Sequence, residues 1–224
     1  MIKAIVTDIE GTTSSLSFVK DILFPYARTH LADFVRHHQD SESIKSLLQD
    51  ACQEVGEELD TEQLIALFKQ WMAEDRKATP LKSLQGLIWE AGYELGAFTG
   101  HLYQDAVESL QAWKSQGLDL YVYSSGSVYA QKLLFSHSDY GDLTPLFSGY
   151  FDTHIGGKKE AESYQRIAEQ IQRQPGELLF LSDLKEELDA ARLTGYQTIW
   201  LTRDNLPNPD AEHRQVSRFD LIRL

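Results

Sequence analysis

Apolar residues follow two different periods along the chain, one typical of strands and one typical of helices. A β-branched apolar run over residues 2–7 meets the acid Asp8 and then Gly11, which predicts a buried strand that breaks into a loop. From residue 18 to about residue 115, apolar side chains recur at helical spacing almost throughout. This helical pattern breaks at three places, which are Asp60-Thr61, Thr79-Pro80 and residues 96–100. The pattern therefore predicts one strand followed by a long all-helical stretch.

Beyond about residue 105, short apolar runs alternate with helical segments. Strands are predicted at residues 118–123, 151–155, 178–181 and 198–201, and helices at 105–116, 127–134, 160–171 and 184–193. The stretch after Asn205 contains Pro207 and Pro209 and is predicted to be irregular. This alternation predicts an α/β fold, a doubly wound parallel sheet. The domains follow from it: a core of residues 1–16 and 104–224, and a helical cap insertion of residues 17–103.

Composition and charge exclude several classes of protein. The 224 residues carry 34 acidic and 21 basic side chains, a net charge of −13, which argues against nucleic acid or an anionic membrane as a partner. The single cysteine, Cys52, excludes an internal disulfide and a multi-cysteine metal site. No apolar run approaches the length of a membrane helix, and a cytoplasmic protein is predicted. An anionic ligand would need local positive charge.

Polar residues follow the predicted strands, at the edge where open α/β sheets bind their ligands. These residues are Asp8, Glu10, Ser124, Ser125, Lys158, Asp183 and Glu187. Each has a structural alternative, because strand-end acids and serines often cap helices or form turns, and lysines usually lie at the surface. Their joint occurrence at one kind of position favours a single functional site.

The same residues carry a resemblance to a known family. The segment Asp8-Ile9-Glu10-Gly11-Thr12-Thr13 resembles the D-x-[DE]-G-T signature of the haloacid dehalogenase-like phosphatases, the HAD superfamily. Three further motifs of that superfamily are matched by Ser124, by Lys158 and by Ser182-Asp183 with Glu187. Glu10 at the second acidic position, together with residues 84–93, 123–127 and 157–164, is similar to the enolase-phosphatases of methionine salvage. One departure is Arg203-Asp204-Asn205, where an Arg-Pro-Gly-Asn-like turn is expected.

The resemblance implies a HAD-like Rossmannoid core with a helical cap, and it implies roles for the site residues. Asp8 would be the nucleophile and Glu10 the general acid and base. One Mg²⁺ per subunit would be held by Asp8, Asp183 and the backbone carbonyl of Glu10, with Glu187 orienting a metal-bound water. The remaining residues would bind the phosphoryl oxygens, and these are Ser124, Ser125 and Lys158.

The implied substrate is a small phosphorylated diketone, 5-methylthio-2,3-dioxopentyl 1-phosphate, and the resemblance favours a monomer. The enzyme would enolise this substrate and then remove phosphate to give an acireductone. Which residues catalyse enolisation stays open. The candidates are Lys82, Trp89, Tyr93 and His101, although core packing is the alternative for the two larger aromatic side chains. The alternative function is another capped phosphatase that acts on a sugar phosphate or phosphoglycolate.

Overall fold

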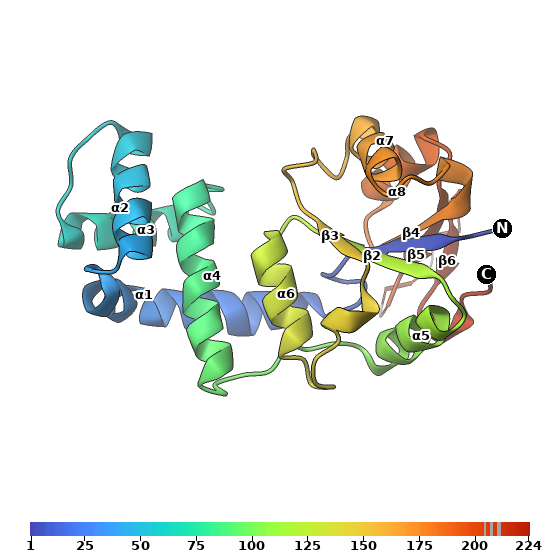
Figure 1. The fold of residues 1–224 in the computed structure, drawn as a ribbon, viewed down its shortest axis with the longest axis horizontal. Coiled ribbons are helices and arrows are strands. Elements are labelled where there is room, and N and C mark those ends of the chain that lie inside the picture. The colour runs from blue at the N-terminus through green and yellow to red at the C-terminus, as the bar shows by residue number, and fades with distance from the viewer. Residues whose placement is uncertain (204, 207, 210–211) are drawn as a thin grey trace. The chain divides into compact units, whose positions relative to one another are not determined.

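The computed structural model describes residues 1–203, 205–206, 208–209 and 212–224. This part of the chain forms a six-stranded sheet in the order β3-β2-β1-β4-β5-β6, and every neighbouring pair is parallel (Figure 1). The strands are β1 Ala4–Thr7, β2 Asp119–Tyr123, β3 Gly149–Phe151, β4 Leu178–Ser182, β5 Gln197–Leu201 and β6 Arg214–Val216. The predicted doubly wound α/β fold is confirmed.

The first strand lies in the middle of the sheet. All four residues of β1 and all five of β4 are buried, as expected for parallel strands that are covered on both faces. Ala4 pairs with Asp119 of β2 on one side and with Leu178 of β4 on the other. The strand order therefore reverses between β1 and β4, and this switch point is where open α/β sheets bind ligands.

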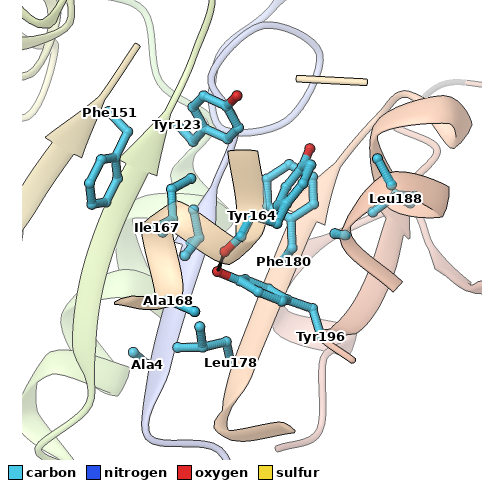
Figure 2. Close-up of a cluster of buried hydrophobic side chains, with 13 residues drawn as sticks. Ala4, Tyr123, Phe151, Tyr164, Ile167, Ala168, Leu178, Phe180, Leu188 and Tyr196 are labelled. Atoms are coloured by element: carbon cyan, nitrogen blue, oxygen red, sulfur yellow. Dashed lines mark hydrogen bonds between the residues drawn. The ribbon is translucent and has the colours of Figure 1, made fainter. Parts of the chain in front are cut away.

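Helices cover both faces of the sheet. The core helices are α5 Gln104–Ser115, α6 Val128–Ser136, α7 Ala161–Gln170 and α8 Lys185–Leu193, with short 3₁₀ turns at Thr144–Leu146, Pro175–Glu177 and Phe219–Leu221. Helices α7 and α8 lie on one face and α5 lies on the other (Figure 1). Figure 2 shows the packing beneath α7, where the Tyr196 hydroxyl donates to the Tyr164 carbonyl at 2.8 Å. Even the polar ends of these core tyrosines are therefore satisfied.

The chain divides into two compact units, Met1–Phe18 with Thr99–Leu224 and Val19–Phe98, called here the core unit and the helical unit. A π-helical segment, Phe18–Leu23, leads into the helices α1 Phe24–His38, α2 Glu42–Val55, α3 Thr61–Ala73 and α4 Thr79–Glu94. Asp60 caps α3 in a capping box with Gln63, and Pro80 sits in the first turn of α4, which explains two of the predicted breaks. None of the described helices is long and apolar enough to cross a membrane.

One predicted strand is misplaced, and one observed strand was not predicted. The strand predicted at 151–155 is wrong in place: β3 ends at Phe151, because Asp152 turns the chain by accepting a hydrogen bond from the His154 amide. The last strand is β6, in the stretch predicted to be irregular. This edge strand of three residues buries only Val216, too little for a visible alternation. Asp204, in the segment that departs from the family pattern, lies outside the described residues.

Candidate active site

Asp8 lies at the switch point, directly after β1, and its side chain is buried. Its amide donates to Leu181 of β4 at 2.9 Å, which ties the end of one central strand to the other. Its Oδ1 accepts a hydrogen bond from Lys158 Nζ at 2.5 Å, and Thr12 Oγ1 donates to its Oδ2 at 3.5 Å. The predicted nucleophile is therefore a buried carboxylate with a fixed direction.

Lys158 is the cation of the site. Its side chain is only 6% exposed, and its Nζ also lies 2.7 Å from Oε2 of Glu187, in the first turn of α8. Burial alone would lower the pKa of Lys158, but Asp8 and Glu187 outweigh that effect and hold the pKa above its usual value. The structural alternative for Lys158, a position at the surface, is therefore wrong, and Glu187 is buried as well.

Buried tyrosines hold the loop that carries Lys158. The Tyr164 hydroxyl, from α7, donates to the Lys158 carbonyl at 2.7 Å, and the Tyr123 hydroxyl, at the end of β2, donates to the Gly156 carbonyl at 2.8 Å. Both rings belong to the cluster drawn in Figure 2. Sequence reasoning noted these tyrosines only as parts of motifs and gave them no role. The available signal was a tyrosine at a position that the apolar pattern predicts to be buried, because a buried tyrosine hydroxyl usually needs a hydrogen-bond partner.

Asp183 follows β4 and faces the backbone of the turn after β1. Gly11 has a φ of +71°, and a Cβ added there would overlap the Asp183 carboxylate. Trp200 Nε1 donates to the Asp183 carbonyl at 2.8 Å, which fixes the backbone from β5. Burial, then the nearby charges of Asp8 and Glu187, raise the pKa of Asp183 to about 7. The chain thus brings a third carboxylate close to the first two.

The charges and donor atoms of this group fit a divalent cation. When ionised, Asp8, Asp183 and Glu187 leave an excess of two negative charges over Lys158. No group of three or more His, Cys, Asp or Glu side chains among the described residues is arranged as a metal site. Mg²⁺, however, is usually bound by one or two carboxylates together with other oxygens. Asp183 suits that donor set. So does Asp8, because among the described residues Lys158 binds only its Oδ1 and its Oδ2 accepts only the 3.5 Å hydrogen bond from Thr12. Glu187 suits it less, because its Oε2 is bound both to Lys158 and, at 2.8 Å, to Ser182 Oγ.

Ser124 follows β2 and is buried, whereas the side chain of Ser125 is exposed. The Gly126 amide donates to Ser124 Oγ at 3.3 Å. Ser127, not Ser124 or Ser125, caps α6, so helix capping does not explain the first two serines. Since β2 is the neighbour of β1, the structure places this turn at the same edge of the sheet as Asp8.

Two residues without a predicted role hold the turn after β2. Nε2 of the buried Gln131, on α6, donates to the carbonyls of Gly126 and Phe151, both at 2.8 Å. Asp152 Oδ2 accepts from the Val128 amide at 3.0 Å. Burial opposes ionisation of Asp152, but hydrogen bonds from His154 and Val128 outweigh it and lower the pKa of Asp152.

The four enolisation candidates fall in different units. Lys82, Trp89 and Tyr93 belong to α4 of the helical unit, where Trp89 Nε1 donates to the Leu23 carbonyl at 2.8 Å. His101, which the predicted boundary at residue 103 put in the insertion, belongs to the core unit. Its Nδ1 accepts from the Ser15 amide at 3.2 Å, close in sequence to the turn after β1. A role in enolisation stays a prediction for all four.

Comparison with known proteins identifies relatives over the whole chain. Residues 2–211 match the model of the haloacid dehalogenase-like hydrolases. The enolase-phosphatase E1 of Yersinia enterocolitica is 56% identical over 223 residues, which cover 99% of this chain and 97% of that protein. The enolase-phosphatase E1 of Methylococcus capsulatus is also 56% identical, over 224 residues that cover 100% of this chain and 98% of that protein.

Solved structures agree with the sequence relatives. The UTR4 protein of Saccharomyces cerevisiae has a TM-score of 0.86 at 34% identity and covers 99% of this chain and 100% of its own. CbbY from Rhodobacter sphaeroides, in complex with phosphate, has a TM-score of 0.61 at 17% identity, covers 99% of this chain and 96% of its own, and shows the shared fold alone. The family predicted from the motifs is confirmed. The chain belongs to the haloacid dehalogenase-like hydrolases, and among them to the enolase-phosphatase E1 family.

Proposed function

We propose that this chain is a Mg²⁺-dependent enolase-phosphatase, an acireductone synthase. It would enolise 5-methylthio-2,3-dioxopentyl 1-phosphate and then hydrolyse the phosphate ester of the enol. The product would be the acireductone 1,2-dihydroxy-5-methylthiopent-1-en-3-one. The observation that supports this most directly is the buried Asp8–Lys158–Glu187 network at the switch point of the sheet. The names of the relatives support the same pair of reactions.

Asp8 supplies the nucleophile for phosphoryl transfer. One carboxylate oxygen attacks phosphorus, the ester oxygen leaves, and an aspartyl-phosphate forms on Asp8. Water then attacks that phosphorus, releases phosphate and regenerates the carboxylate. Lys158, which holds Asp8 Oδ1 in the structure, would contact the phosphoryl oxygens during transfer, together with Ser124 and the backbone amides near Ser125.

Glu10 serves as the general acid and base. It sits two residues beyond the nucleophile, on the turn that follows β1, and is partly buried. It would first protonate the leaving oxygen and later take a proton from the attacking water. Its side chain is one methylene longer than aspartate, and we infer that this length suits an enol leaving group.

A single Mg²⁺ per subunit completes the proposal. Asp8, Asp183 and the Glu10 carbonyl would hold it, and it would supply the positive charge that lets a phosphate dianion approach three carboxylates. The proposal also keeps two predictions made from the sequence, a monomeric state and a cytoplasmic location. Light scattering of the purified protein and cell fractionation would check them.

The test follows enol absorbance and phosphate release together, with Mg²⁺ and the dioxo phosphate. We expect a transient enol followed by phosphate, and loss of phosphate release with EDTA. Phosphate without an enol would instead favour the alternative, a phosphatase for a sugar phosphate or phosphoglycolate, which a panel of such esters would identify. If neither product forms, the proposed function is wrong.

Two variants and one matched control sharpen this test. Asp8→Asn should lower phosphate release by at least about 10³-fold, because it removes the nucleophile while keeping the shape of the side chain. Asp119→Asn, at the opposite end of the neighbouring strand β2, is the matched control and should retain activity. Glu10→Asp should lose more activity on the dioxo substrate than on a simple phosphate ester. Equal retention on both would contradict the role given to its length.

A further inference from the structure

Arg203 contacts the backbone of the turn that links Asp8 to Thr13. It lies after β5, and its side chain is 8% exposed. Its Nε donates to the carbonyl of Thr12 at 2.9 Å, and its Nη2 donates to the same oxygen. Two N–H groups of one guanidinium thus converge on a single carbonyl of the turn that carries Glu10.

The other side of the guanidinium is bound just as firmly. Nη1 donates to both carboxylate oxygens of Asp105, at 3.1 and 2.8 Å, and Asp105 is 7% exposed. Asp105 Oδ2 also accepts from the Phe219 amide at 2.7 Å. The guanidinium lies 3.9 Å from the ring centre of Tyr103. A planar fork held by a carboxylate and a ring has little freedom to move.

The same network reaches the next residue of the turn. The Tyr103 amide donates to the Thr13 carbonyl at 2.9 Å. Thr12 itself donates, through Oγ1, to Asp8 Oδ2 at 3.5 Å. Two successive carbonyls of the turn are therefore fixed from outside. A buried ion pair often adds little net stability compared with apolar side chains, so stability alone is a weak reason for this pair.

We propose that Arg203 is a positioning residue for phosphoryl transfer. Anchored on Asp105, its guanidinium holds the turn over residues 9–13 and so keeps the carboxylates of Asp8 and Glu10 aimed at the substrate. This inference rests on the proposed function for its catalytic consequence. The contacts that carry it do not involve any bound group.

The first test is Arg203→Lys, which keeps the positive charge but removes the planar guanidinium that donates to Thr12 and Asp105 at once. We expect kcat for phosphate release to fall by about 10²-fold while KM changes by less than about twofold, because misplacement of reacting groups by about 1 Å costs that much. The matched control is Arg173→Lys. Arg173 pairs with Asp119 at 2.8 Å, at the opposite edge of the sheet. An unchanged kcat in Arg203→Lys, or an equal loss in both variants, would overturn the inference.

The second test does not depend on activity. Hydrogen exchange of the amides over residues 9–14 is measured in the metal-free protein, where Thr12, Thr13 and Ser14 donate to the Ile9 carbonyl. These amides should exchange faster in Arg203→Lys than in the wild type, and at the wild-type rate in Arg173→Lys. Unchanged exchange in both variants would refute the inference that Arg203 holds the turn. If Arg203→Lys fails to fold, Asp105→Asn keeps an acceptor for Phe219 and should show a smaller effect of the same kind. A wild-type protein that hydrolyses no phosphate ester would refute the proposed function, and the exchange result would still decide whether Arg203 holds the turn.

Discussion

At the scale of single residues, one ammonium group, that of Lys158, balances two buried carboxylates of the site. Lys158 Nζ lies 2.5 Å from Asp8 and 2.7 Å from Glu187, and all three side chains are buried. Without this cation, two carboxylates would face each other in a poorly screened environment. Lys158 thus offsets part of the negative charge of the two carboxylates and holds Asp8 in the position that the proposed nucleophile needs.

Gly11 leaves no room for a Cβ beside the Asp183 carboxylate, and its replacement gives a sharp prediction. Gly11→Ala should lower the free energy of unfolding by about 1–2 kcal/mol, because φ is +71° and a side chain is disfavoured there. It should also lower phosphate release by about 10²-fold, because the new Cβ would displace the Asp183 carboxylate. Urea unfolding and a phosphate-release assay measure the two effects separately.

Gly56 provides the matched control for this substitution. It has a φ of +75°, but an added Cβ would meet nothing within 4 Å. Gly56→Ala should therefore show a similar loss of stability and an unchanged activity. Equal activity in the two variants would mean that the fit between Gly11 and Asp183 does not matter for the reaction.

At the scale of elements, the start of α6 is held from the neighbouring strand β3. Asp152 follows β3 and accepts from the Val128 amide, while Gln131 of α6 donates to the carbonyls of Gly126 and Phe151. The turn after β2 lies between these contacts. Its backbone is therefore held in place, as the proposed binding of phosphoryl oxygens by this turn requires.

Asp152 gives this element a predictable pH dependence. Its pKa is lower in the folded protein than in the unfolded chain, so its stabilising effect is complete above about pH 4 and is lost as the pH falls through the lower value. Asp152→Asn should lower the free energy of unfolding by about 0.5–1 kcal/mol at pH 7. Urea unfolding should show that the difference in the free energy of unfolding between the wild type and Asp152→Asn is smaller at pH 3 than at pH 7. A difference of constant size would mean that the carboxylate charge plays no part.

Sequence patterns located two of the site carboxylates because these residues follow fully buried strands. Asp8 and Asp183 come directly after β1 and β4, where the apolar runs are unmistakable. The edge strands β3 and β6 have three residues each, too few to show a period; β3 was misplaced and β6 was not predicted. Gln131 was not singled out, and Arg203 was noted only as part of a departure from the family pattern. Both act on backbone carbonyls, and nothing in a sequence indicates which carbonyl a side chain will meet.

At the scale of the whole molecule, the net charge and the local charge of the site have different consequences for binding. The net charge of −13 argues against polyanionic partners, yet part of that charge is the site itself. Asp8, Asp183 and Glu187 are concentrated around one lysine, where short distances and burial weaken screening. Local charge, rather than net charge, therefore decides whether a small phosphate ester binds.

The central place of β1 also has a consequence for how the protein folds. Ala4 of β1 pairs with Asp119 and Leu178, which are both more than a hundred residues away in the sequence. The helical unit, in contrast, is built from one continuous segment, Val19–Phe98. Because local contacts form faster than distant ones, we expect α1–α4 to gain structure before the sheet closes. Pulsed hydrogen exchange during refolding should protect amides of these helices earlier than those of β1. Simultaneous protection would mean that the two units fold together, and that the central strand β1 is not the last element to pair.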